Sequence, residues 1–186
     1  GRPDRLPTMS LNAEQIAFRA AREAREGEVA YLGGGLAARV RRYLPPSVRV
    51  VAEGQGGRRV DVAFLSASMI CCRGDLVSST RTGATPRCDG STALDCAAAR
   101  IVVVMPHTVE GEASIVEHRA EHTGEGNGEP HRCIITELAL MEVTEKGLVL
   151  RELAPGISAR EVQHATGTLL LVGPELVEMV FPHPLP

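Results

Sequence analysis

The feature that most limits how this chain folds is a series of short apolar segments separated by turns and helical patterns. The segments are rich in Val, Leu, Ile and Ala, and they lie at residues 28–32, 48–53, 60–68, 100–106, 133–153 and 168–173. The sequence RIVVVMP at 100–106 is almost continuously apolar, which is typical of a strand buried on both faces. Strands that alternate with helices over 186 residues predict one α/β domain with an open, mostly parallel sheet flanked by helices.

Helical patterns fill several of the intervals between these segments. We predict helices over residues 10–27, 36–44, 92–99 and 158–167. Asn12 with Gln15, and Ser158 with Glu161, have the spacing of capping boxes. Gly27 supplies a stop for the first helix. The segment 168–173 is then expected to complete the sheet, and TEKG within 133–153 to form a hairpin turn.

Composition argues against several classes of function. The net charge is −3, so the chain has no basic field for nucleic acid, and 3% aromatics leave no platform for base stacking. No apolar run approaches the roughly 20 residues of a membrane span, and we see no signal-peptide pattern. Five cysteines in apolar or loop contexts favour reduced thiols and a cytoplasmic location.

The chain divides unevenly into three parts. We expect residues 1–10 to be a tag or a flexible N-terminal extension, 11–175 to form the α/β domain, and 176–186 to be a C-terminal tail. Two long polar stretches, 73–92 and 107–131, are predicted loops inside the domain. Loops of that length often carry function, so we expect these two to define specificity.

The sequence VRVVAEGQGG places one acid at the end of a predicted strand and before a glycine turn. The acid is Glu53, followed by Gly54 and Gly56. The carboxyl ends of strands are where open α/β sheets bind ligands. Glycines let a substrate approach the backbone, and they free N–H groups to face an oxyanion. On spacing alone, a solvated acid in a turn is the more common explanation for Glu53.

A second glycine turn, Gly33-Gly34-Gly35, lies between a predicted strand and a predicted helix. Such a turn sometimes holds a phosphate at a helix N-terminus. It lacks the G-x-G-x-x-G spacing and the lysine of a P-loop. A tight structural turn therefore explains it equally simply.

Metal and serine chemistry have weaker support. His118 and His122 are four residues apart, and His131 and Cys133 follow, but the sequence offers no second clean pair of ligands. We therefore predict no metal site. No G-x-S-x-G elbow is present, so a serine hydrolase of that type is not expected.

From residue 11 to about 172, the order of these pieces resembles the B (beta) subunit of family I coenzyme A transferases. The sequence GDLVSS at 74–79 is similar to the Gly-Asp-Leu-Ala-Asn segment of that family, and AYLGGGLAARVRRYLP to its first glycine turn and helix. Residues 133–167 resemble its strand–turn–strand–helix ending. AEGQG falls where the family has Ser-Glu-Asn-Gly, whose Glu is the nucleophile.

This resemblance implies a CoA-transferase (NagB/RpiA-like) fold and a site. Glu53 would be the catalytic nucleophile, forming a glutamyl-CoA thioester and passing CoA to a carboxylate acceptor. Coenzyme A would be a substrate, with no tightly bound cofactor. An A-type subunit would complete a heterodimer or heterotetramer, with a homo-oligomer as the alternative. The expected oxyanion or CoA-binding residues are Gly33, Gly34, Gly35, Gly54, Gly56, Gly90 and Ser91.

The chain also departs from the family pattern. Only GQGGRR separates Glu53 from the next strand, where the family has a few tens of residues. Asp89-Gly90-Ser91-Thr92 replaces a Gly-Met-Gly-Gly turn, and Tyr31 replaces an Asn. These departures leave two alternatives open. One is the same scaffold acting as a thioester hydrolase, a C–C cleaving enzyme or a cyclising enzyme on CoA or carrier-protein thioesters. The other is a non-catalytic partner in a complex.

Overall fold

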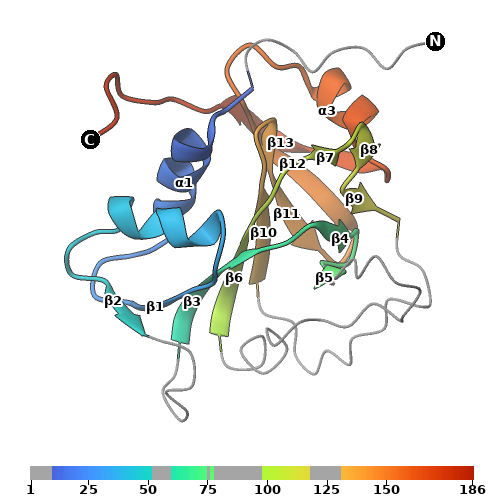
Figure 1. Cartoon of the computed structure of the whole chain (residues 1–186). Helices are drawn as coiled ribbons and strands as arrows, with labels where there is room; N and C mark the ends of the chain where they lie inside the picture. Colours follow the sequence, from blue (N-terminus) through green and yellow to red (C-terminus); the bar gives the residue numbers. More distant parts are fainter. Residues whose placement is uncertain (1–9, 52–59, 75, 78–97, 118–130) are drawn as a thin grey trace.

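A computed structural model describes residues 10–51, 60–74, 76–77, 98–117 and 131–186. Its centre is an eight-stranded sheet with the strand order β13-β12-β11-β10-β6-β3-β1-β2 (Figure 1). The strands of this sheet are β1 (Val29–Leu32), β2 (Arg49–Val51), β3 (Val60–Ser66), β6 (Ala98–Val104), β10 (His131–Ile135), β11 (Ala139–Thr144), β12 (Gly147–Leu153) and β13 (Leu170–Glu178). The open, mostly parallel sheet predicted from the sequence is confirmed, because β11 alone among these strands runs antiparallel to its two neighbours.

Shorter strands in the described ranges form two small sheets beside the large one. The first has the order β5-β4-β9, and the second pairs β7 with β8. Their bounds are β4 (Met69–Cys71), β5 (Leu76–Val77), β7 (Thr108–Val109), β8 (Glu112–Ala113) and β9 (Ile115–Val116). The predicted loops 73–92 and 107–131 therefore contain short strands where the structure describes them.

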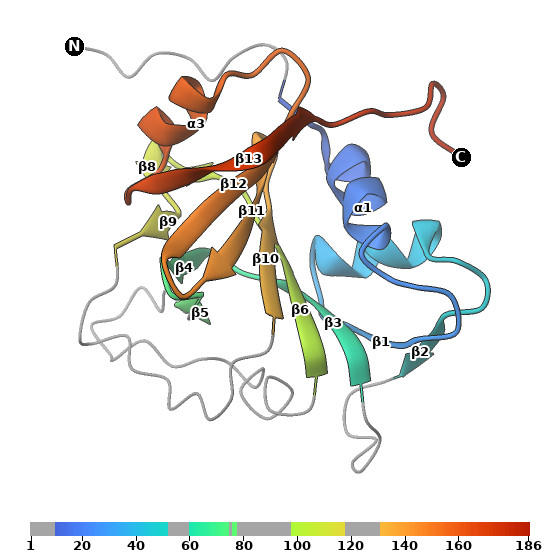
Figure 2. The same ribbon diagram turned by 180° about the vertical axis from the view of Figure 1, so that it is seen from behind.

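Helices flank the large sheet. α1 (Ala13–Ala21) and the 3-10 helix η1 (Ala37–Tyr43) contact each other and lie on one side of it. The small sheets and α3 (Ala159–Ala165) lie toward the other side (Figures 1 and 2). No described helix has the length and apolar character that crossing a membrane requires.

Both predicted capping boxes are present. Asn12 Oδ1 accepts the N–H of Gln15 at 2.9 Å, and the Gln15 side chain accepts the N–H of Asn12 at 2.9 Å. Ser158 and Glu161 make the same reciprocal pair at the start of α3.

The prediction that the first helix runs to Gly27 is wrong, because α1 ends at Ala21 with Arg22 as its C-cap. Gly27 has φ +78°, a conformation that favours glycine, in the turns that lead from α1 into β1.

The prediction of a helix over residues 92–99 is wrong at its C-terminal end. Ala98 and Ala99 belong to β6, which pairs with β3 on one side and β10 on the other. Alanine favours helices in isolation, but a place between two paired strands overrides that preference. Residues 92–97 lie outside the described part of the chain.

The core is aliphatic, as the composition requires. Ile101, Val102, Val103 and Val104 of β6 are all buried, which confirms a strand covered on both faces. The expected boundary between residues 175 and 176 falls inside β13, and Met179 just after this strand is buried. The first part of the expected tail thus packs with the domain.

Candidate active site at the carboxyl edge of the sheet

The carboxyl ends of β2, β1 and β3 lie side by side. In the parallel register, Tyr31 of β1 pairs with Val51 of β2 and with Ala63 of β3. β2 ends at Val51, at the edge where β1 leads into Gly33, and Glu53 follows Val51 by two residues in the sequence. Glu53 itself, and with it Gly54, Gly56, Gly90 and Ser91, lies outside the described residues.

The turn Gly33-Gly34-Gly35 connects β1 to η1 at this edge. The N–H of Gly33 donates to Phe64 O at 2.8 Å, which continues the pairing of β1 with β3. A Cβ on Gly33 would lie 3.2 Å from that same oxygen, and Gly35 has φ +64°. Steric crowding thus favours glycine at position 33, and the backbone conformation favours it at position 35. Gly34 has open space around its Cβ position.

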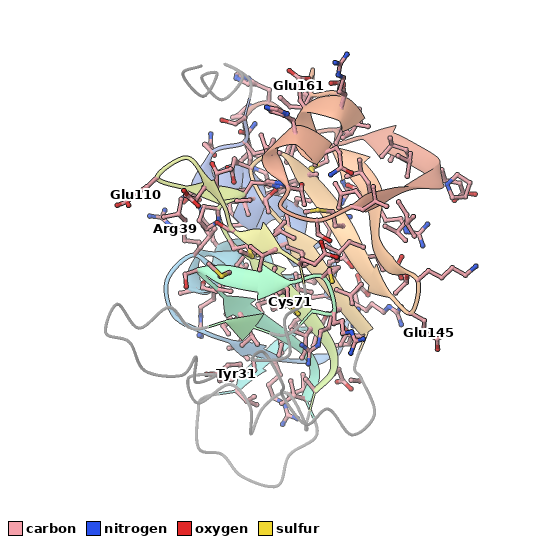
Figure 3. The ribbon with its side chains drawn as sticks, turned by 90° about the vertical axis from the view of Figure 1, so that its right-hand side faces the viewer. Tyr31, Arg39, Cys71, Glu110, Glu145 and Glu161 are labelled. Carbon is pink, nitrogen blue, oxygen red and sulfur yellow. The ribbon has the colours of Figure 1, made fainter. Side chains whose placement is uncertain are left out.

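Free backbone donors remain in this turn. Within the described part of the chain, the N–H groups of Gly34, Gly35 and Leu36 donate to no protein acceptor. Gly34 and Gly35 are also exposed. Figure 3 shows Tyr31, just before the turn, and Arg39, just after it, while Glu145 lies on the other side of the molecule. The turn therefore offers exposed N–H groups beside the end of β2.

Ser66, the last residue of β3, holds the glycine turn in place. Its hydroxyl donates to Gly34 O at 2.7 Å and accepts the N–H of Ala37 at 2.9 Å. Ser66 is exposed, so solvent reaches this end of the strand. Sequence reasoning missed this residue, although its position at the end of an apolar strand was a usable signal.

A second polar cluster lies further along the same edge, where β6 and β10 end. His107 is fully buried, and its Nδ1 lies 2.9 Å from Thr136 Oγ1 and its Nε2 lies 2.8 Å from Thr166 Oγ1. The backbone N–H of His107 donates to Glu137 Oε2 at 2.8 Å. This cluster joins the ends of β6 and β10 to the end of α3.

The hydrogen bonds around His107 assign its tautomer. The Thr166 hydroxyl donates to Val162 O at 2.7 Å, so its oxygen accepts a hydrogen bond from the Nε2–H of His107. Thr136 Oγ1 accepts the N–H groups of Leu138 and Ala139, and its single proton faces two acceptors, Ala139 O at 3.3 Å and Nδ1 of His107 at 2.9 Å. Donation along the shorter contact, to Nδ1, leaves the imidazole neutral with its proton on Nε2.

Burial shifts the pKa values in this cluster in opposite senses. Desolvation lowers the pKa of His107 to about 4, since a buried imidazole resists taking up charge. Desolvation also raises the pKa of Glu137, against the opposing effect of the N–H that His107 donates to it. The strands β6, β3 and β1 separate β10 from β2, so the cluster stabilises the sheet edge at a distance from the end of β2.

The weak metal hypothesis receives no structural support from Cys133. This side chain is buried in β10, and burial raises the pKa of its thiol. Within the described ranges, no three His, Cys, Asp or Glu side chains gather in a way that would hold an ion. His118 and His122 lie outside those ranges, as does the side chain of His131.

Comparison with known proteins finds relatives of the kind that the motifs resemble. The chain is 27% identical over 213 aligned residues to the B subunit of 3-oxoadipate CoA-transferase from Acinetobacter baylyi, covering 87% of this chain and 95% of that one. It is 26% identical over 201 residues to the beta subunit of a probable coenzyme A transferase from Bacillus subtilis, covering 82% and 91%. No protein-family model matches the sequence.

Solved structures share the fold. The decarboxylase AibA/AibB matches with a TM-score of 0.72 at 19% identity, covering 91% of this chain and 89% of that one. An acyl-CoA transferase of Escherichia coli O157:H7, solved as a thioester complex with CoA, matches with a TM-score of 0.68 at 20% identity. That match covers 97% of this chain and 45% of the other.

The sheet and these structural matches give the chain the α/β fold of CoA-transferases. The resemblance to the B subunits of CoA-transferases is confirmed.

Proposed function

We propose that this chain is the B-type subunit of a CoA-transferase, with Glu53 as its nucleophile. The observation that carries the proposal is the place of Glu53 in the chain. It comes two residues after Val51 in the sequence, and Val51 ends β2 at the edge where the Gly33–Gly35 turn offers free N–H groups. The names of the relatives, which are B and beta subunits of CoA-transferases, support the same activity.

The reaction divides one acyl transfer into balanced steps. The Glu53 carboxylate attacks the thioester carbonyl, and the CoA thiolate leaves from an acyl–glutamyl anhydride. The thiolate then attacks the glutamyl carbonyl, which releases the first carboxylate and leaves a glutamyl-CoA thioester. An acceptor carboxylate takes the CoA by the same steps in reverse. Each attack creates an oxyanion, which backbone N–H groups stabilise.

The proposed active unit includes a second chain. The relatives are named as B and beta subunits, and AibA/AibB is named as a pair. We propose that the partner is an A-type subunit, in a heterodimer or heterotetramer. Coenzyme A enters as a substrate, and the acyl group and acceptor are set by the partner together with the loops of this chain.

Intact-protein mass spectrometry tests the proposal. The chain, purified with any co-eluting subunit, is treated with a panel of acyl-CoAs. We expect a mass gain equal to CoA less water in wild type, mapped to Glu53, and none in Glu53→Ala. Glu145→Ala is the matched control, since this exposed acid lies in the turn between β11 and β12. An adduct that survives in Glu53→Ala would sink the proposal.

A second candidate keeps the scaffold and changes the reaction to thioester hydrolysis or C–C cleavage. It is favoured by the six residues between Glu53 and β3, and AibA/AibB is a decarboxylase with this fold. This candidate predicts product without an acceptor acid. Strict dependence of turnover on a carboxylate acceptor would exclude it.

A further inference from the structure

We infer that Ser66 is a positioning residue for the oxyanion donor of this site, acting through the Gly34–Gly35 peptide. The inference rests on the proposed function for the reaction itself. Its geometry comes from Ser66, Gly34, Gly35 and Ala37, all of which the structure describes.

The Ser66 hydroxyl bridges the two groups that close a four-residue turn. Gly34 O and Ala37 N–H stand three residues apart, and a simple turn would join them directly. Here Ser66 Oγ accepts from Ala37 at 2.9 Å and donates to Gly34 at 2.7 Å. The hydroxyl thus fixes the position of both groups from another strand, β3.

Fixing the Gly34 carbonyl also fixes the next N–H. The Gly34–Gly35 bond is trans, because the one cis bond of the described chain is His183–Pro184. In a trans peptide, the C=O and N–H point in opposite directions. Gly34 O points toward Ser66 on β3, so the N–H of Gly35 points away from the Ser66 hydroxyl.

That N–H is a suitable oxyanion donor. It has no acceptor within the described residues, and Gly35 is exposed. β1 separates β3 from β2, so the turn lies between Ser66 and the strand that leads to Glu53. As Glu53 attacks, the electron pair of the thioester C=O moves to its oxygen, and a donor held beforehand stabilises that charge without reorganisation.

Gly35 suits the pair of hydrogen bonds that Ser66 makes with Gly34 and Ala37, which we call the Ser66 clamp. A Cβ at this position would lie 3.3 Å from Ser66 Oγ and 3.7 Å from Ser66 Cβ. Its φ of +64° also favours glycine. The close approach of the hydroxyl and the left-handed backbone therefore both favour glycine at this residue.

The test compares Ser66→Ala with Ser66→Thr, which retains a hydroxyl, and with Ser47→Ala. Ser47 Oγ accepts the N–H of Gly27 at 3.1 Å, at the opposite end of the same strands, and is a matched control. The rate of glutamyl adduct formation is measured against acyl-CoA concentration in the complex. Hydrogen exchange of the Ala37 amide is followed in parallel.

We expect Ser66→Ala to slow adduct formation at saturating acyl-CoA by about 10- to 100-fold, less than or comparable to the loss of a direct donor. Half-saturation should stay within about threefold, since the clamp acts on the oxyanion and not on ground-state binding. Ser66→Thr should recover most of the rate, and Ser47→Ala should match wild type. The Ala37 amide should exchange faster in Ser66→Ala alone.

Two failures are distinguishable. A wild type that forms an adduct at the same rate as Ser66→Ala overturns the role of Ser66 and leaves the proposed function standing. A wild type that forms no adduct with any acyl-CoA overturns the proposed function, and the role of Ser66 in it. An unchanged Ala37 exchange rate in Ser66→Ala overturns the clamp by itself.

Discussion

At the scale of single residues, Gly34 and Gly35 are neighbours with different constraints. We expect Gly35→Ala to lower the free energy of unfolding by about 1–2 kcal/mol, because its φ of +64° disfavours a side chain. Gly34→Ala should change it by less than about 0.5 kcal/mol, since nothing lies within 4 Å of the added Cβ. Urea unfolding of both variants measures the difference, and equal losses would contradict the turn geometry.

The residues that sequence reasoning predicted well act over short range. Asn12 with Gln15, and Ser158 with Glu161, are three residues apart, and each pair forms the reciprocal cap that the spacing predicts. Ser66 is different, since its partner Gly34 is 32 residues away along the chain. No local pattern shows which turn a serine at a strand end will reach.

At the scale of elements, His107 connects β6, β10 and α3, and this connection should depend on pH. Its folded pKa of about 4 lies below the ordinary 6.5, so the unfolded chain binds its proton first as the pH falls. The contribution of His107 to stability is therefore complete above pH 6.5 and is lost between pH 6.5 and about 4. The full loss is about 3 kcal/mol.

This prediction is measured by urea unfolding between about pH 7 and pH 4.5, the window in which the unfolded chain takes up the proton first. Glu137 has a raised pKa and contributes with the opposite sign, so the effect of His107 is the difference between wild type and His107→Gln. His164→Gln, at an exposed position of α3, is the control. An NMR titration of wild type gives an independent check, and a midpoint for His107 close to the ordinary 6.5 would contradict its burial.

The elements of the second half follow the sequence most closely. The hairpin β11–β12 turns at Glu145 and Lys146, within the TEKG that predicted it. The first half holds the exceptions, because tertiary context decides them. The predicted helix 36–44 forms as the 3-10 helix η1, and Ala98 extends β6. An alanine-rich segment does not reveal that two strands will pair on either side of it.

At the scale of the whole molecule, β13 leaves one edge of the large sheet without a described neighbour. Apolar side chains are exposed along and beside it, at Leu169, Leu171, Val172, Val177 and Val180. An apolar strand at a free edge favours association with other chains. We therefore expect the isolated chain to self-associate as its concentration rises.

Light scattering measures this expectation. Val172→Lys with Val177→Lys should lower the concentration-dependent rise in apparent mass, with little change in the midpoint of thermal unfolding, because both side chains are largely exposed. Val109→Lys, an exposed position on β7, is the matched control and should leave the association as in wild type. A double variant that associates like wild type would rule out the β13 edge as the contact.

The fold was more predictable than the site. Buried strands could be predicted because each one is a short segment of mostly apolar residues, which is visible in the sequence itself. The proposed site rests on Glu53, Gly54, Gly56, Gly90 and Ser91, which stand in polar stretches of sequence without a periodic pattern. These residues were predicted from the resemblance to a family. The pattern of apolar segments predicted only the edge of the sheet at which the site would lie.

The clamp by Ser66 has a consequence for recognising other chains of this kind. The turn is completed by a side chain from another strand, so its shape is encoded in two distant segments read together. A search based on Gly33–Gly35 alone would pool turns of different geometry. A signature that couples a glycine at position 35 with a small hydroxyl residue at the end of β3 should select chains that present the same peptide in the same orientation.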